Sequence, residues 1–574
     1  MKVKAKKVGV TQRTATKIGL VTSIFVIMSS IMGVGIFFKN GAVFRTNNGN
    51  CWGVLVSWLL TGIIAIFTAI SFTEVLTVKQ KDNFGSGLGG WASELNGYNF
   101  GRATRIWMPT FYYSLKLMAC TIYTGTTIVY LGYCMTDDPQ QDWLGSAKDF
   151  TTLVIMAIGM AVVGIFITIN YISEKVGPAM TRALTIMKFI PIALVLIVCI
   201  VSVIRTDSGL WGGNTSYVAG LDPEKAGQFD MLGVLNSIPG IMFTFDGFLA
   251  IGNISHKVDK PEKNVSLAVV FGMIVVIILN LIVTLSFVTI GSANPFGIFG
   301  VAFETGLDAS SSAYKTAHEI SKWCSLVMTI LIIVSAVGAI NAYSIIGCSA
   351  CREGVESETL MFGKQIKTIK GGNTKLAGAL YFGAIMLFYY IAFGIPSCIL
   401  NTIQIFDGTG ATIVLFFFAI YAFTLAGGIA NRRTKKHEVQ KSKAFTVLAP
   451  IAVAGCTFVF LYSLVYTYTI NTFSNGLDSV WTVWGLSFTP KSWNDARSAG
   501  GTNLYTWEAM IVFWSTIFFF IAFPFINDAV LKATNKEYPH ALVWQKRKEY
   551  KTVIETKPTP PSPKNTPSSP TAAQ

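Results

Sequence analysis

Lys116, Lys188 and Asp246 are ionisable residues that stand well inside long apolar stretches of this chain. Charge is costly within a membrane, so such a residue indicates a functional site by default. Asp246 could contact a ligand's ammonium group, bind a proton or pair with a lysine, and it could instead cap a helix end. These residue types predict a site that handles charge.

The two lysines suggest different chemistry. Lys188 lies well inside the fifth apolar run, where loss of solvent disfavours its charged form, so we expect it to exchange a proton and to couple transport to it. Lys116 could select an acidic ligand side chain or neutralise Asp246. For either lysine the alternative is a long side chain that reaches the membrane surface.

Glycine interrupts two of the apolar runs at corresponding places. The first interruption is Gly33-Val34-Gly35-Ile36 and the second is Phe243-Thr244-Phe245-Asp246-Gly247. A helix broken in mid-membrane exposes N–H and C=O groups that lipid cannot satisfy, and paired breaks indicate a transporter's binding site. The alternative is that these glycines only permit close helix packing.

The breaks predict a ligand with both charges. Free N–H groups around Gly33–Gly35, at the positive end of a half-helix, suit a carboxylate, and glycine lets it approach closely. Free carbonyls near Phe245–Gly247 suit an ammonium group. We therefore expect a small zwitterion, with an α-amino acid as the simplest case. The predicted binding residues are Gly33, Val34, Gly35, Ile36, Phe243, Phe245, Asp246, Gly247 and Lys116.

The elements that must position these residues are membrane helices. Only 13% of the residues are charged, 52% are hydrophobic and the mean hydropathy is +0.52, whereas soluble domains have roughly 25% charged residues. Twelve runs are long enough to span, and the alternation of a membrane barrel is absent. The runs lie at about 18–45, 52–78, 106–135, 150–170, 178–204, 232–255, 264–291, 318–350, 375–398, 402–430, 445–470 and 506–530.

The charge distribution predicts the orientation. The net charge is +15, but with a cytoplasmic N-terminus most of the Lys and Arg fall in the tails and inner loops, as the positive-inside rule requires. This predicts a multi-pass plasma-membrane protein with both termini in the cytoplasm. The basic segment 546–548 is then a topology signal or a contact to anionic lipid, so no nucleic-acid partner is expected.

The order of the runs predicts two inverted repeats. Residues 1–17 form a basic cytoplasmic tail, and residues 18–205 and 232–431 each hold five spans that begin with a broken helix. Five is odd, so the second repeat enters from the opposite side. The remaining parts are residues 445–530 with an outer loop at 471–505, and a cytoplasmic tail at 531–574, Pro/Ser-rich and disordered from about 557.

Four segments resemble the amino acid–polyamine–organocation permeases. They are the G-x-G-I-F of residues 33–37, the Phe243–Phe248 motif with residues 257–264, the segment from Gly177 to Pro191, and the small-residue helix from Ser335 to Arg352. The resemblance implies an all-α, leucine-transporter-like fold of twelve helices in a 5+5 inverted repeat, with helices 1 and 6 broken.

The resemblance also implies roles for single residues. It implies that the two breaks hold the amino acid's carboxylate and ammonium, and that Lys188 occupies the place where sodium-coupled members bind sodium. It also implies that Phe243 and Phe245 form an aromatic gate that closes over the substrate, and the alternative for these two rings is packing in the core. His256 departs from the family, which usually has an acidic residue there.

The sequence thus predicts secondary active transport of amino acids by alternating access, coupled to protons or working by exchange. The alternatives are a sodium-coupled symporter of the same fold, which Lys188 disfavours, and a non-concentrative amino-acid sensor. An enzyme is not expected, because the chain has neither a nucleotide-binding G-x-x-x-x-G-K-[ST] nor a catalytic or metal constellation. No cofactor is expected, and membrane lipid is the remaining partner. The identity of the amino acid and the oligomeric state stay open.

Overall fold

The computed structural model describes most of the chain between residues 19 and 534. The described ranges are 19–32, 35–78, 87–135, 150–173, 176–206, 227–249, 258–291, 295–369, 372–399, 404–470 and 505–534. Gly33, Val34 and His256, nearly all of the predicted outer loop, and both predicted tails apart from the first residues of the C-terminal one therefore lie outside the described residues.

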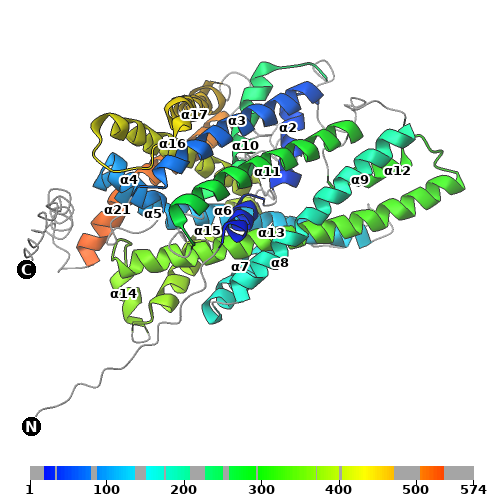
Figure 1. The fold of residues 1–574 in the computed structure, drawn as a ribbon. Coiled ribbons are helices and arrows are strands. Elements are labelled where there is room, and N and C mark those ends of the chain that lie inside the picture. The colour runs from blue at the N-terminus through cyan, green and yellow to red at the C-terminus, as the bar shows by residue number, and fades with distance from the viewer. Residues whose placement is uncertain are drawn as a thin grey trace, which may run out of the picture.

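The described residues form a bundle of helices (Figure 1). The first half of the chain contains α1 (Leu20–Ile31), α2 (Gly35–Thr46), α3 (Cys51–Val75), α4 (Leu88–Asn96), α5 (Tyr98–Trp107), the π-helical turn η2 (Met108–Tyr112), α6 (Tyr113–Met135), α7 (Thr151–Ile172), α8 (Val176–Met187) and α9 (Phe189–Thr206). The second half contains α10 (Met231–Phe245), α11 (Pro261–Ile290), α12 (Ile298–Glu304), α13 (Ser312–Glu356), α14 (Gly363–Thr368), α15 (Thr374–Ile399), α16 (Gln404–Thr434), α17 (Lys443–Tyr462), the π-helical η7 (Ser463–Ile470) and α21 (Tyr505–Thr534).

Membrane-spanning helices dominate this architecture. Among the described residues, ten helices are long and apolar enough to cross a membrane. The predicted third span corresponds to η2 and α6, and the predicted sixth begins with α10, which has only 15 residues. The predicted count of twelve therefore depends on including these two.

Both predicted breaks interrupt helices. The first span is divided into α1, which ends at Ile31, and α2, which begins at Gly35. In the sixth, α10 ends at Phe245 and the backbone becomes extended at Asp246. The fifth span also contains a junction, because α8 ends at Met187 and α9 begins at Phe189, with Lys188 between them.

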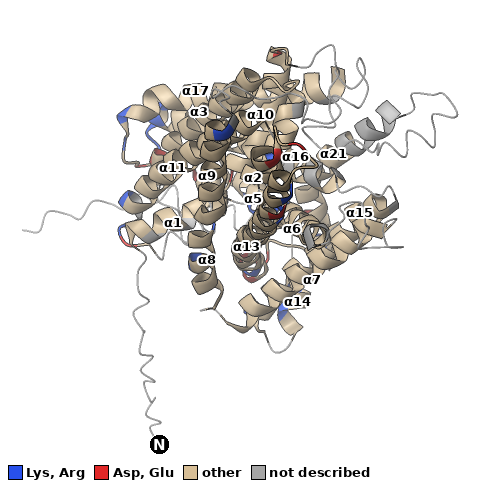
Figure 2. Cartoon of the chain, turned by 90° about the vertical axis from the view of Figure 1, so that its right-hand side faces the viewer, with Lys and Arg blue, Asp and Glu red and all other residues tan. Residues whose placement is uncertain are grey.

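The longest helix, α13, organises the centre of the bundle. It has 45 residues and runs across the molecule from α12 to α14 (Figure 1). It packs against α6, α8 and α15. Most of the ribbon carries neither acidic nor basic residues (Figure 2). The few buried charges therefore stand out against an apolar core.

Candidate functional site

The two broken helices touch each other at their breaks. Gly247 has a φ of +110°, and a Cβ there would lie 2.8 Å from the carbonyl oxygen of Ser30. The Ser30 hydroxyl donates to the Gly247 carbonyl at 3.3 Å. A Cβ on Gly35 would lie 2.6 Å from Oγ1 of Thr244. At Gly247 only glycine tolerates both this backbone conformation and this proximity, which explains the residue type there.

Asp246 lies at the end of α10 and is fully buried. Its Oδ2 accepts from Nζ of Lys116 at 2.7 Å and from the Tyr112 hydroxyl at 2.6 Å. Its Oδ1 accepts from the Tyr421 hydroxyl at 3.1 Å. Asp246 and Lys116 therefore form a buried ion pair.

The local fold of the third span positions two of these donors, Tyr112 and Lys116. Pro109 lacks an N–H and lies in η2, where the helix widens into a π turn. Tyr112 closes that turn, and Lys116 follows one helical turn later on the same face. Residues four apart on one helix thus bind the same carboxylate oxygen.

Lys188 is buried against the end of α1. Its Nζ donates to the carbonyls of Ser29 at 2.9 Å and of Met32 at 2.7 Å. These belong to the last turn of the half-helix, where carbonyls lack intrahelical partners. On α13, a Cβ at Gly338 would lie 3.1 Å from Cε of Lys188, so glycine makes room for the lysine.

Another tyrosine completes the end of α1. The hydroxyl of Tyr343, on α13, donates to the carbonyl of Ser30 at 3.1 Å. Carbonyls of this helix end are thus bound by one side chain from the junction of α8 and α9 and by one from α13, and both connect these elements to α1.

The two predicted gate residues lie in different surroundings. Nζ of Lys116 and Nζ of Lys39 each lie 5.2 Å from the centroid of the Phe243 ring. Phe245 packs edge-on against Trp58 of α3 at 5.7 Å between centroids. Phe243 therefore borders the charged centre, whereas Phe245 belongs to the core between α10 and α3.

The structure brings most of the described predicted residues together at one centre. Gly35 and Ile36 begin α2 beside the end of α10, and Lys188 reaches the other side of the same break through the end of α1. The N–H groups of Gly33 and Val34 lie outside the described residues. Within the described part of the chain, no cluster of three or more His, Cys, Asp or Glu side chains suits a metal ion.

Several residues at this centre were not found from the sequence. Tyr112 could have been found by its four-residue spacing from Lys116. Lys39 lies four residues after Gly35 in the same apolar run, yet it is only 2% exposed. Tyr343 and Tyr421 carry no local signal, because a tyrosine in a span is common and only its packing partner distinguishes it.

A further polar group faces the contact between the breaks. The Thr244 hydroxyl oxygen is buried and has no hydrogen-bond partner among the residues that the structure describes. It lies beside Gly35 at the beginning of α2, where N–H groups also lack intrahelical partners. The centre thus combines unpaired hydrogen-bonding groups with neutralised charge, which suits a small polar ligand.

Comparison with known proteins gives a consistent result. The family model described as amino acid permease matches residues 18–488. The human b(0,+)-type amino acid transporter 1 is 22% identical over 471 residues, covering 78% of this chain and 85% of that protein. The serine/threonine exchanger SteT of Bacillus subtilis is 24% identical over 284 residues, covering 50% of this chain and 57% of the exchanger.

A solved structure shares the fold. MhsT in complex with L-phenylalanine superimposes with a TM-score of 0.50 at 15% identity, covering 77% of this chain and 98% of MhsT. The predicted leucine-transporter-like, all-helical fold is therefore confirmed.

Proposed function

The chain belongs to the amino acid permease family, and from this premise we propose that it moves amino acids across the plasma membrane by alternating access, driven by protons or by exchange. The family and the transporter relatives indicate amino-acid transport rather than an enzymatic reaction. The observation that carries the proposal is the contact between the two helix breaks, with Lys188 bound to the end of one of them.

The substrate's two charges find complementary backbone groups at the breaks. We propose that the carboxylate binds N–H groups of Gly33, Val34 and Gly35, at the positive end of α2. The ammonium binds carbonyls in the last turn of α10, at the negative end of that helix. Asp246 already accepts from Lys116 and two tyrosines, so the backbone carbonyls serve the ammonium.

Phe243 is placed to cover the bound substrate. Its ring borders Lys116 and Lys39 and is 4% exposed, so its movement would open or close the centre. Its position two residues before the end of α10 supports this role.

The occupied carboxylate also bears on substrate choice. A cationic side chain would need a carboxylate partner, and Asp246 is held by Lys116 at 2.7 Å. We therefore propose that arginine and lysine are poor substrates. Competition with a labelled neutral amino acid tests this: excess arginine should leave uptake nearly unchanged, and strong inhibition would contradict it.

Lys188 is the proposed coupling residue. Its ammonium binds two carbonyls of α1 that carry no formal charge, so it can lose its proton without leaving a carboxylate unpaired. Loss of that proton weakens both hydrogen bonds and frees α1 to move. The same ammonium would repel a sodium ion at this position, which disfavours the sodium-coupled alternative.

Uptake into proteoliposomes tests the proposal. A labelled amino-acid mixture is offered under an imposed pH gradient without sodium, to the wild type and to Lys188→Ala. We expect accumulation by the wild type and its loss in the variant, with exchange of internal for external substrate retained. Lys375→Ala, at the beginning of α15, is the matched control and should accumulate substrate normally.

The other outcomes separate the alternatives. Uptake that requires sodium and survives Lys188→Ala would overturn the coupling assignment. Binding of an amino acid without accumulation or exchange would indicate a sensor. No binding or uptake of any amino acid would contradict the proposed function itself.

A further inference from the structure

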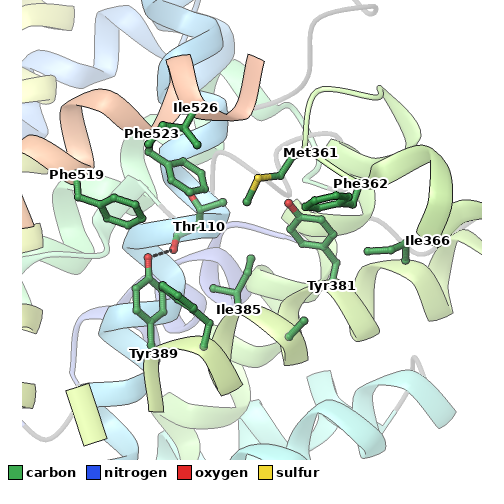
Figure 3. A pocket seen from close by; sticks show the side chains of 12 residues that line it. Thr110, Met361, Phe362, Ile366, Tyr381, Ile385, Tyr389, Phe519, Phe523 and Ile526 are labelled. Carbon is green, nitrogen blue, oxygen red and sulfur yellow. Dashed lines mark hydrogen bonds between the residues drawn. The ribbon is translucent and has the colours of Figure 1, made fainter. Parts of the chain in front are cut away.

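A second cavity lies away from the charged centre. It has a volume of about 400 Å³ and lies between η2, α14, α15 and α21 (Figure 3). Its walls are formed mainly by large apolar side chains, among them Ile366, Ile385, Phe388, Phe519, Phe523 and Ile526. A cavity of this composition suits an apolar occupant.

Two of the polar side chains that line the cavity already have partners. The Tyr389 hydroxyl donates to the Thr110 carbonyl at 2.6 Å (Figure 3). The Thr110 hydroxyl donates to the carbonyl of Ile106 at 2.6 Å. The Tyr381 hydroxyl is the third polar group in a lining that is otherwise apolar, so an acyl chain fits better than a polar metabolite.

The cavity borders the lipid-facing surface of the bundle. Four large apolar side chains of its wall are exposed: Phe388 at 52%, Phe362 at 44%, Ile526 at 40% and Phe519 at 37%. Both α15 and α21 are long and apolar enough to span a membrane. Exposed apolar side chains on such helices face lipid, so the occupant can enter from the bilayer.

Basic side chains lie on two of the segments that border the cavity. Lys364 lies on α14, two residues before Ile366, and Lys532 lies in the last turn of α21; both are exposed. The Gln365 side chain donates to the Thr534 carbonyl at 3.5 Å, which joins α14 to the end of α21. Both lysines flank this junction in the sequence, and exposed ammonium groups there would attract a phosphate.

We propose that this cavity binds one acyl chain of an anionic phospholipid, with the lipid phosphate at Lys364 and Lys532. The chain fills the apolar space and the headgroup meets the two ammonium groups. The site is separate from the proposed amino-acid site and does not depend on it.

Bound lipid would also support the charged centre. Phe111 packs against two cavity-wall residues, with ring centroids 5.1 Å from Phe523 and 5.6 Å from Phe519. Phe111 directly precedes Tyr112, which donates to Asp246. An acyl chain in the cavity would thus pack against the π turn η2, which positions the Tyr112 hydroxyl.

Photolabelling tests the proposal without any transport assay. The full-length protein in nanodiscs is exposed to phosphatidylglycerol with a diazirine near the end of one acyl chain, and the labelled peptides are identified by mass spectrometry. We expect label on cavity-wall residues of α15 and α21. Phosphatidylcholine with the same diazirine should label them less.

Matched variants locate the label. Ala384 lines the cavity and is exposed, so Ala384→Phe should fill the space, fold normally and lose most of the label. Ala392→Phe, also exposed on α15 but outside the cavity walls, should keep it. Lys364→Gln and Lys532→Gln should each weaken phosphatidylglycerol labelling on the order of fivefold, and Lys315→Gln at the opposite end of α13 should not.

Two results would overturn the inference. Equal labelling of wild type and Ala384→Phe would show that the cavity is not the binding site. Equal labelling by phosphatidylcholine and phosphatidylglycerol, unchanged by both lysine variants, would show that no anionic headgroup is selected. Neither result bears on amino-acid transport.

Discussion

Lys116 and Lys188 are both buried near the helix breaks, but their surroundings differ in charge. Lys116 is bound to the carboxylate of Asp246, which two tyrosine hydroxyls also contact. Lys188 is bound to the backbone carbonyls of Ser29 and Met32 and, at 3.5 Å, to the Ser29 hydroxyl. Lys116 pairs with a charge, whereas the partners of Lys188 in the described part of the chain are neutral dipoles.

This difference suggests that the charge of Lys116 is structural, whereas Lys188 can exchange its proton. Deprotonating Lys116 would leave Asp246 as a buried, unpaired carboxylate, and such charges are very costly. Deprotonating Lys188 removes a buried charge and leaves no new one. The first region should therefore hold the fold together, and the second should respond to protons.

The largest expected effect comes from breaking the charged pair. Asp246→Ala leaves the ammonium of Lys116 buried without a counter-ion, so we expect the free energy of unfolding to fall by about 3–5 kcal/mol. Denaturant titration of the purified protein in detergent measures this.

A double variant provides the control for that loss. Lys116→Met with Asp246→Leu removes both charges and should recover much of the stability, because a buried pair is often replaceable by apolar residues. A double variant as unstable as Asp246→Ala would show that the loss comes from packing and not from charge.

A smaller loss should follow removal of one hydroxyl from the carboxylate. Tyr112→Phe deletes a hydrogen bond to a charged group, which contributes about 1.5–3 kcal/mol. The free energy of unfolding should fall by this amount in the same titration. An unchanged stability would mean that the Asp246 carboxylate is satisfied by Lys116 and Tyr421 alone.

The Tyr343 hydroxyl, at the end of α1 that also binds Lys188, should contribute less to the free energy of unfolding than the Tyr112 hydroxyl. Tyr343→Phe deletes one hydrogen bond to the neutral carbonyl of Ser30, which contributes about 0.5–1.5 kcal/mol. Measured side by side, Tyr343→Phe should be more stable than Tyr112→Phe. The reverse order would contradict the contrast between the two regions.

The smallest effect on stability is expected for Lys188 itself. Lys188→Met removes hydrogen bonds to carbonyls but also removes a buried charge, and the two terms oppose each other. We expect thermal unfolding in detergent to shift only slightly, corresponding to about 1 kcal/mol. Proton-driven accumulation should nevertheless be lost, and a variant as unstable as Asp246→Ala would make Lys188 a structural residue.

Much of the site could be predicted from local sequence. Two glycines separated by Val34 within an apolar run predicted the division of the first span, and the helix ends at Ile31 and begins again at Gly35. The second break was predicted at Phe243–Gly247, and α10 ends at Phe245. A break depends on backbone freedom at a few adjacent residues, so the local sequence carries the signal.

The burial of Lys39 could not be predicted from the local sequence. Only Lys116 and Lys188 had been assigned to the interior of the spans, yet Lys39 is 2% exposed. It lies in α2, near an end of the first apolar run, and whether an ammonium at such a position reaches water depends on the helices that surround it.

The sequence by itself determined that charged residues and broken helices occupy the interior of a membrane bundle, because apolar length and glycine position are local properties. Only the tertiary structure decided that Lys116 faces Asp246, 130 residues away, while Lys188 faces the end of α1. The sequence allowed Lys116 either to bind the substrate or to neutralise Asp246, because a lysine can serve in both roles. Which one occurs depends on how α6 and α10 pack, since a charge pair forms only where two helices bring the groups within hydrogen-bonding distance.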